Sequence, residues 1–326
     1  MYRPLGSATL DTGETVTLAI VMPPHGALAQ SARRLLAHKS RLWQLHLDAA
    51  LAGEADSLET RLHLALLGRT PVANIMTVEH RGVGILGHVF TRPEYRRKGI
   101  CKQLMARQME DFRSRGGQCL VLGTGYQTTP YRIYESFGFR SLRGGFMRYD
   151  TGDPAAFEAR WFAAGDAEIV PGRWEHWATT SILAASPDGT LLRSARWNVF
   201  GVGLLEHPYL AALIESRSGS GAAVRVLQTP SGAAVGVASV QAHGVWPSVW
   251  IVDAFTHPNF AARKRDLVEA LPLPSGLCVA YALPEESASV AFWESVGFRK
   301  ACIVPGLLRI DGAARDVVTL TRETQG

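Results

Sequence analysis

The sequence predicts a mixed α/β protein, with sheets flanked by helices, built from two domains of similar design. Three observations support this fold class. Strand-like runs occur between residues 60 and 91, helical periodicity begins after Pro93, and the same landmarks recur further along the chain. The chain has 326 residues, of which 47% are hydrophobic, and this is enough for two hydrophobic cores.

The first 91 residues are predicted to form two helices and an antiparallel meander of strands. Residues 15–22 alternate as a strand does, and Pro23-Pro24 ends that strand. Short turns at Gly68-Arg69 and Arg81-Gly82 separate the later strands. The predicted helices cover 27–39 and 41–52, and the later strands cover 60–67, 72–79 and 83–91.

The periodicity changes after Pro93 from that of strands to that of a helix. An apolar stripe at helical spacing is followed by Gly116-Gly117, a normal end for a helix. A buried strand at 118–122 and a short helix at 131–137 complete the unit, and strand-like residues extend to Tyr149. The stripe consists of Cys101, Leu104, Met105, Met109 and Phe112.

Two landmarks of the first half recur in the second half in the same order. Phe90-Thr-Arg-Pro93 is matched by Phe255-Thr-His-Pro258, and Tyr134-Glu-Ser-Phe-Gly-Phe-Arg140 by Trp293-Glu-Ser-Val-Gly-Phe-Arg299. Two ordered matches indicate an internal duplication, with domains at 1–150 and 151–326. The second copy is about six positions shorter between its landmarks, because 45 positions separate Pro93 from Gly138 and 39 separate Pro258 from Gly297.

Charge distribution and composition restrict the class of partner. Residues 1–150 carry 20 lysines and arginines against 12 acidic residues, whereas residues 151–326 carry 14 against 17. An anionic partner is therefore expected on the first domain. We expect a small phosphorylated ligand and not nucleic acid, because no basic run is interleaved with aromatic residues. The four cysteines are scattered, which favours reduced thiols and argues against a zinc or other metal site.

The amino-terminal sequence lacks the pattern of a membrane or secretion segment. Its apolar patch, Leu18 to Met22, is too short for a signal-peptide core or for a span across a bilayer. We therefore expect a soluble, cytoplasmic protein without a membrane partner.

The segment from Val89 to Cys101 is predicted to run from a strand through a turn into a helix, which suits a pyrophosphate ligand. Amides at a helix amino terminus are unsatisfied, and the helix dipole adds positive potential there. Gly99 allows the backbone to approach a ligand closely. Arg96, Arg97 and Lys98 supply charge for phosphate oxygens.

Two motifs resemble those of the GNAT (GCN5-related) N-acetyltransferases. Thr91-Arg-Pro-Glu-Tyr-Arg-Arg-Lys-Gly-Ile-Cys101 is similar to the acetyl-CoA signature Arg/Gln-x-x-Gly-x-Gly/Ala of that family. Ile133-Tyr-Glu-Ser-Phe-Gly-Phe139 resembles its second landmark, Leu-Tyr-Glu-x-x-Gly-Phe. Cys101 departs from the signature, where glycine or alanine is usual. The resemblance implies two tandem GNAT-like domains, the second of them degenerate.

The resemblance also implies a set of residues that bind acetyl-CoA, which would be a co-substrate. Main-chain groups of one strand segment would pair with the pantetheine arm, and the following turn would hold the pyrophosphate. Gln127 falls where the family often has an asparagine that contacts the arm. The strand residues are Val89, Phe90 and Thr91, and the turn residues are Arg96, Arg97, Lys98, Gly99, Ile100, Cys101 and Lys102.

For catalysis, Tyr134 matches the family's tyrosine that donates to the departing sulfur, and Tyr131 is the alternative. His88 occupies a strand position where the family often has an acidic residue facing the cleft, so it is a candidate general base. Glu79 on the neighbouring strand is a second candidate, and a proton relay through water is a third possibility. Tyr134 and His88 each have a purely structural alternative as packing residues.

The implied activity is transfer of acetyl from acetyl-CoA to a primary amine, by direct attack in a ternary complex. The acceptor would be a small molecule or a protein amine, and the chain could form a homo-oligomer. The second copy has lost the turn glycine and has Trp293 in place of Tyr134, so it is expected to fold without binding coenzyme A. The alternatives are a non-catalytic coenzyme A sensor or scaffold, an acyltransferase for a longer acyl-CoA, and, less favoured, a nucleic-acid binder.

Overall fold

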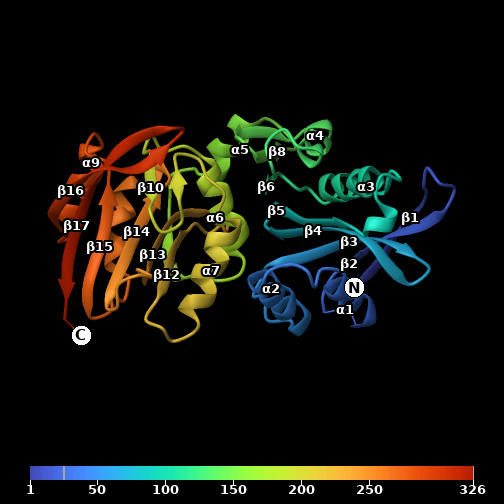
Figure 1. Ribbon diagram of the computed structural model, residues 1–326, viewed down its shortest axis with the longest axis horizontal. Helices are drawn as coiled ribbons and strands as arrows, with labels where there is room; N and C mark the ends of the chain where they lie inside the picture. The colour runs from blue at the N-terminus through green and yellow to red at the C-terminus, as the bar shows by residue number, and fades with distance from the viewer. Residues whose placement is uncertain (25, 326) are drawn as a thin grey trace. The chain divides into compact units, whose positions relative to one another are not determined.

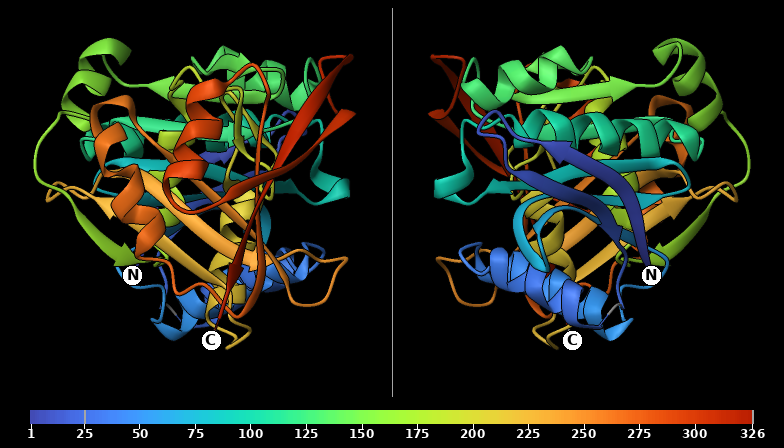
Figure 2. Two further views of the ribbon diagram at one scale, coloured as in Figure 1. Left: turned by 90° about the vertical axis from the view of Figure 1, so that its left-hand side faces the viewer. Right: turned by 90° about the vertical axis from the view of Figure 1, so that its right-hand side faces the viewer.

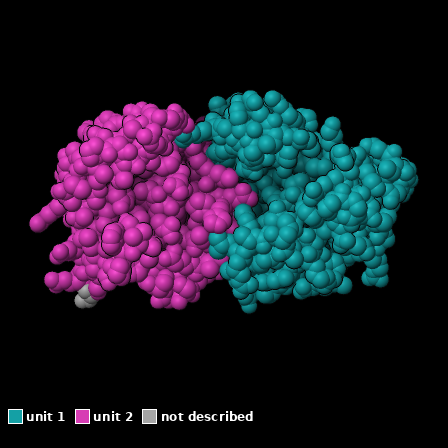
Figure 3. Space-filling model, viewed as in Figure 1, with its two compact units in different colours: residues 1–157 teal, residues 158–326 magenta. Residues whose placement is uncertain are grey.

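The computed structural model describes residues 1–24 and 26–325 of the chain. The chain divides into two compact units, residues 1–157 and residues 158–326 (Figure 3). Each unit contains one large mixed sheet with helices packed on it, which confirms the predicted α/β fold class (Figure 1).

The sheet of the first unit has eight strands in the order β1-β2-β3-β4-β5-β6-β8-β7. All neighbouring pairs are antiparallel except β5 and β6, which run parallel. The strands are β1 (Tyr2–Thr9), β2 (Thr15–Val21), β3 (Glu59–Leu67), β4 (Thr70–His80), β5 (Val83–Thr91), β6 (Cys119–Gly123), β7 (Arg140–Arg143) and β8 (Phe146–Asp150).

Helices cover both faces of this sheet. In Figures 1 and 2, α3 lies on one face, and α1 and α2 lie on the other. The apolar stripe of α3 packs into the main core, where Leu104, Met109 and Phe112 are fully buried. The helices are α1 (Gly26–Leu35), α2 (Arg41–Ala52), the 3-10 turn η1 (Pro93–Tyr95), α3 (Ile100–Ser114), α4 (Thr129–Ser136) and α5 (Pro154–Trp161), which crosses the division between the units.

β5 separates from β6 partway along its length. Their parallel pairs run from Val83 to Ile85 on β5. Beyond them, a register shift against β4 and a positive φ of 50° at His88 mark a β-bulge. Asn74 supports the bulge, because its Nδ2 donates to the His88 carbonyl oxygen at 2.9 Å. The end of β5 therefore has an edge that β6 does not pair with among the described residues.

Read from β9 to β16, the second unit repeats the strand order of the first unit from β2 to β7, and β1 has no counterpart among its described residues. Its sheet runs β16-β17-β15-β14-β13-β12-β9, again with a single parallel pair, β14 with β15. The strands are β9 (Glu168–Pro171), β12 (Ala223–Gln228), β13 (Ala234–Ala242), β14 (Val249–Thr256), β15 (Gly276–Ala282), β16 (Arg299–Ile310) and β17 (Ala313–Thr324), and β10 (Leu192–Ser194) and β11 (Val199–Phe200) form a small hairpin. The helical segments are α6 (His176–Ala185), α7 (Glu206–Ser216), η2 (Pro258–Arg263), α8 (Lys264–Glu269) and α9 (Ser287–Ser295).

Three local details differ from the sequence predictions. The edge strand β1 was not predicted, because Pro4 and Gly6 interrupt its alternation and the structure accommodates them with a register shift. The first helix ends at Leu35 rather than Lys39. The helix predicted at 131–137 begins at Thr129, since Thr128 caps it and Pro130 suits its first turn. No helix among the described residues is long and apolar enough to cross a membrane.

Candidate active site

A cavity of about 590 Å³ lies in the first unit, at the end of β5 and the start of α3. Nine residues predicted to bind the cofactor line it, together with three residues of α4. The structure thus brings the strand end, the bend and α4 to one place. The lining residues are Asp11, Val89, Phe90, Thr91, Tyr95, Arg96, Arg97, Gly99, Ile100, Cys101, Lys102, Thr129, Pro130 and Ile133.

The bend before α3 presents backbone amides to the cavity. Gly99 caps the helix with φ of 80° and ψ of −13°, in the left-handed region that glycine adopts without strain. Arg97 also has a positive φ, of 59°. α3 is 15 residues long and has no acidic residue in its first turn. Its unsatisfied amides and dipole therefore suit an anion, such as a phosphate.

Two of the predicted basic side chains already have partners within the protein. Lys98 does not line the cavity, because its Nζ binds Glu14 Oε2 at 2.9 Å and lies over the Tyr95 ring. Arg96 does line it, but its Nε donates to the Thr91 carbonyl oxygen at 3.0 Å. The charge expected from Lys98 is therefore largely neutralised, and Arg97 and Lys102 are the remaining predicted cations along the cavity.

Asp11 enters the cavity from the turn between β1 and β2, and sequence reasoning did not predict it. Its backbone amide donates to the Lys98 carbonyl oxygen at 3.4 Å, and Gln103 donates to the Thr9 carbonyl oxygen at 2.9 Å. A Cβ added to Gly99 would lie 3.3 Å from Asp11 Oδ1. The turn thus rests directly on the bend. Asp11 was missed because β1, the first of the two strands that flank this turn, was not predicted from the sequence.

His88 is buried beside the strand edge, with 7% of its surface exposed. Its ring meets Trp43 edge-on, with centroids 4.6 Å apart. Burial is the main cause that lowers the pKa of His88 to about 3, and positive charge on His46, Lys39 and His38 lowers it further. The imidazole is therefore neutral at physiological pH.

This low pKa argues against His88 as the base for a protonated amine. Moving a proton from an alkylammonium of pKa about 10.4 to this imidazole would cost roughly 10 kcal/mol. Its Nε2 has no hydrogen-bond partner among the described residues. A neutral imidazole in this state is suited to accept a hydrogen bond from an amine that is already neutral.

Glu79, the second candidate base, does not lie at the cavity. It is 2% exposed and binds Arg115 at 2.9 Å, and Thr77 Oγ1 donates to it at 2.6 Å. On β4 it pairs with Gly84, at the end of β5 away from the bulge. The prediction for Glu79 is therefore corrected. Its carboxylate is a structural partner of Arg115, the residue that follows α3.

Tyr134 and Tyr131 both lie on α4, the helix that contributes Pro130 and Ile133 to the cavity. Both are buried in the main core, with 7% and 6% of their surfaces exposed. Gln127 precedes α4 in an exposed turn, has a positive φ of 57° and does not line the cavity. The structure therefore does not bring Gln127 to the cavity, and His88, Tyr131 and Tyr134 are not among the residues that line it either.

In the second unit, the chain itself fills the corresponding position. β10 packs against β14 and β15 where these strands separate. Asp253, the counterpart of His88, accepts hydrogen bonds from Ser194 Oγ at 2.7 Å and from the amides of Ala195 and Arg196 at 3.0 and 2.8 Å. Lys264 replaces Gly99, and its ammonium lies 4.2 Å from the centre of the Phe292 ring.

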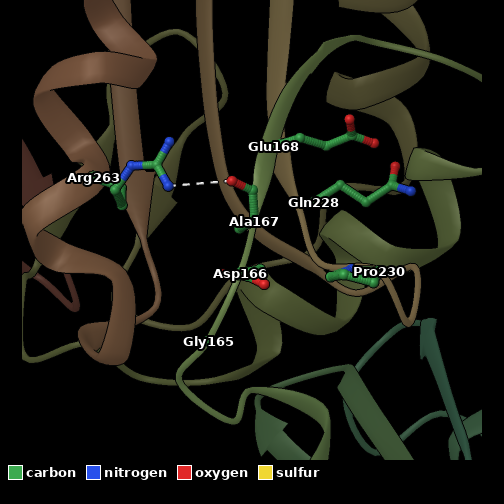
Figure 4. A pocket seen from close by; sticks show the side chains of 7 residues that line it. All are labelled: Gly165, Asp166, Ala167, Glu168, Gln228, Pro230 and Arg263. Atoms are coloured by element: carbon green, nitrogen blue, oxygen red, sulfur yellow. Dashed lines mark hydrogen bonds between the residues drawn. The ribbon is translucent and has the colours of Figure 1, made fainter.

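The space left there is about 10 Å³, enough for one water molecule at most. The second unit has a larger cavity of about 580 Å³ elsewhere, with polar walls, shown in Figure 4. In it Arg263 donates to the Ala167 carbonyl oxygen at 3.1 Å, and the side chains of Asp166, Glu168 and Gln228 stand around the opening (Figure 4). No residue of β14 lines that cavity.

Comparison with known proteins finds similarity in the first unit. Residues 29–142 match a family model described as an acetyltransferase (GNAT) domain. No curated relative matches the chain by sequence. Similar solved structures include the ribosomal-protein-alanine N-acetyltransferase from Brucella melitensis, with 18% identity, coverage of 48% of this chain and 99% of that chain, and a TM-score of 0.39. A phosphinothricin acetyltransferase from Sinorhizobium meliloti in complex with acetyl-CoA has 16% identity, coverage of 48% and 88%, and a TM-score of 0.37.

Proposed function

We propose that the first unit, which is a GNAT acetyltransferase domain, transfers the acetyl group of acetyl-CoA directly to a primary amine in a ternary complex. One observation carries this proposal: the end of β5, where β6 no longer pairs with it, and the bend before α3 line the same cavity of about 590 Å³. An extended arm that ends in a diphosphate matches these two features together.

In the proposed complex, the diphosphate binds the amides from Arg97 to Lys102, and Arg97 and Lys102 supply positive charge. The pantetheine arm then runs back along β5 and pairs with the main chain of Val89 and Thr91, as an added strand does. The thioester consequently reaches the bulge at His88. Arg96 must release the Thr91 carbonyl oxygen if the arm uses that acceptor.

The amine must lose its proton before it attacks the thioester. At pH 7 about one molecule in 10³ is neutral, which costs about 4–5 kcal/mol for a pKa near 10.4. We propose that bulk water removes this proton and that His88 Nε2 accepts a hydrogen bond from the neutral amine. Holding the two reactants in one cavity provides most of the remaining acceleration.

We assign no cofactor to the second domain, 151–326, and propose a structural role for it beside the catalytic domain, 1–150. The support is the segment from Leu192 to Arg196, which is hydrogen-bonded to Asp253, the counterpart of His88, where the arm would run in the first domain. Lys264 also removes the glycine that a close approach to phosphate needs.

A thiol-release assay tests this function. Acetyl-CoA and a panel of primary amines should give free coenzyme A and an equal amount of acetylated amine. The same panel with propionyl- and succinyl-CoA measures the preferred acyl length. Tight binding of acetyl-CoA without thiol release for any amine would contradict the transferase activity, and faster release from a longer acyl-CoA would contradict the choice of acetyl.

The rate should depend on pH through the amine and not through His88. Because the pKa of His88 is lowered to about 3, its imidazole stays neutral from pH 6 to 9. The logarithm of kcat/KM should therefore rise by about one unit per pH unit over this range, without a break near 6.5. A break near 6.5 that disappears in His88→Gln, while the exposed control His207→Gln of the second unit keeps it, would show that His88 titrates normally and acts as the base.

A further inference from the structure

The acyl end of the proposed cofactor site is bordered by the connection between α1 and α2. Two ring contacts join this connection and the first turn of α2 to β5. His38 lies against Phe90 with centroids 4.3 Å apart, and Trp43 meets His88 at 4.6 Å. His38 is exposed and Trp43 is half-buried, so these rings form a wall that is partly open to solvent. We call His38, Trp43, His88 and Phe90 the aromatic wall.

The aromatic wall includes a polar atom that lacks a partner. His88 is more than nine-tenths buried, and its Nε2 accepts no hydrogen bond and donates none within the described chain. A buried polar atom without a partner costs free energy unless a ligand or water satisfies it. A polar ligand or a water molecule that reaches this atom would satisfy it.

Positive charge surrounds the aromatic wall. Lys39 follows His38 in the sequence, and its charge is close enough to disfavour protonation of His88. The Arg96 guanidinium lies 5.8 Å from the centre of the Phe90 ring. A ligand at the wall would therefore meet the positive charges of Lys39 and Arg96.

Acidic residues do not balance this charge. The segment 26–47 contains lysine and arginine but neither aspartate nor glutamate. The next carboxylate along the chain, Asp48, is bound by Arg33 at 2.9 Å. Asp11 lines the cavity at the bend, and Glu94 lies in η1 and does not line the cavity.

We propose that the acceptor is an amine that also carries a carboxylate, joined through a flat apolar body. This inference rests on the proposed transferase function and names its substrate class. The flat body stacks on His38 and Trp43, the carboxylate faces Lys39, and the amine nitrogen meets His88 Nε2 beside the thioester. A polyamine fits this site poorly, because its second cation faces the same positive charges.

Three para-substituted benzylamines form a matched test series. 4-(Aminomethyl)benzoate, 4-(aminomethyl)benzamide and 4-(aminomethyl)benzylamine share the ring and the reacting aminomethyl group, and they differ by one charge at each step. Calorimetric titration of each into the full chain saturated with coenzyme A measures binding without turnover. We expect the benzoate to bind at least 10-fold more tightly than the diamine, which corresponds to about 1.4 kcal/mol.

Variants of single charged residues test which side chain causes the preference for the benzoate. Lys39→Gln should remove most of the preference for the benzoate, and Lys39→Arg should retain it. Arg34→Gln is the matched control, because Arg34 is exposed, belongs to the same segment and binds Ser31 at 2.7 Å. It should leave the preference within about twofold of the original.

The outcomes separate this inference from the proposed function. Equal affinities, tighter binding of the diamine, or no binding of any of the three would overturn the inference. Selective binding of the benzoate without acetylation would support the binding site and contradict the transferase function. Acetylation of all three at equal kcat/KM would support the transferase function and contradict the proposed substrate class.

Discussion

Replacing Gly99 with aspartate is expected to weaken acetyl-CoA binding by at least about 100-fold. Aspartate tolerates the φ of 80° at this position better than most residues do. Its Cβ would lie 3.3 Å from Asp11 Oδ1, and its carboxylate would stand at the amides proposed to bind phosphate. Two like charges about 5 Å apart repel by roughly 3 kcal/mol at an effective dielectric constant of 20. Titration of acetyl-CoA into the variant measures the loss.

Two further variants separate charge from backbone effects. Gly99→Asn adds nearly the same volume without charge and should lose less affinity than Gly99→Asp. Gly116→Asp is the matched control at the other end of α3, where φ is 76° and an added Cβ meets nothing within 4 Å. It should bind acetyl-CoA normally. Equal losses of acetyl-CoA affinity at both positions would mean that the substitutions impair folding. That result would contradict the proposed role of the bend in binding.

Tyr134→Phe is expected to lower kcat by about 100-fold and to leave the affinity for acetyl-CoA within twofold. Phenylalanine keeps the packing of a buried ring against Phe139, whose centroid is 6.1 Å away, and removes only the hydroxyl. The hydroxyl is proposed to donate to the sulfur as the carbon–sulfur bond breaks. Steady-state kinetics with a saturating amine, alongside titration of acetyl-CoA, measures the two quantities separately.

Tyr131→Phe is the matched control for this prediction. Tyr131 lies on the same helix, is equally buried and meets the Tyr126 ring at 5.4 Å. It should retain most of the wild-type kcat. A larger loss at Tyr131 than at Tyr134 would transfer the role to Tyr131, and no loss at either would leave the departing thiolate without a protein donor.

Local patterns in the sequence were sufficient to predict the elements that build the site. The change from alternation to helical spacing after Pro93 predicted the strand, the bend and α3, because each is determined by residues close together in the chain. The glycine before α3 was recognisable for the same reason. Nine predicted residues consequently line one cavity.

Long-range contacts were not predictable in this way. Lys98 pairs with Glu14, which is 84 positions away, and the Glu79 side chain is bound by Arg115, which is 36 positions away. The local periodicity of the sequence predicts neither pairing. The His88 ring contacts Trp43, which is 45 positions earlier, and burial is the main cause that lowers the pKa of His88. The chemistry of an individual side chain was therefore less predictable than its element.

The second unit illustrates the same distinction. The missing glycine near residue 264 and the tryptophan at 293 were visible in the sequence. The segment that fills the separated strands was not, because Ser194 and Asp253 are 59 positions apart. We therefore propose that this segment, in addition to the two sequence changes, prevents the second unit from binding the cofactor.

The structure of the chain crystallised with acetyl-CoA tests the central claim most directly. We expect electron density for the diphosphate against the amides from Arg97 to Lys102, density for the pantetheine arm beside Val89 to Thr91, and no cofactor at the segment around Asp253 and Lys264. A cofactor seated only in the second unit, or an empty bend at saturating acetyl-CoA, would contradict the account.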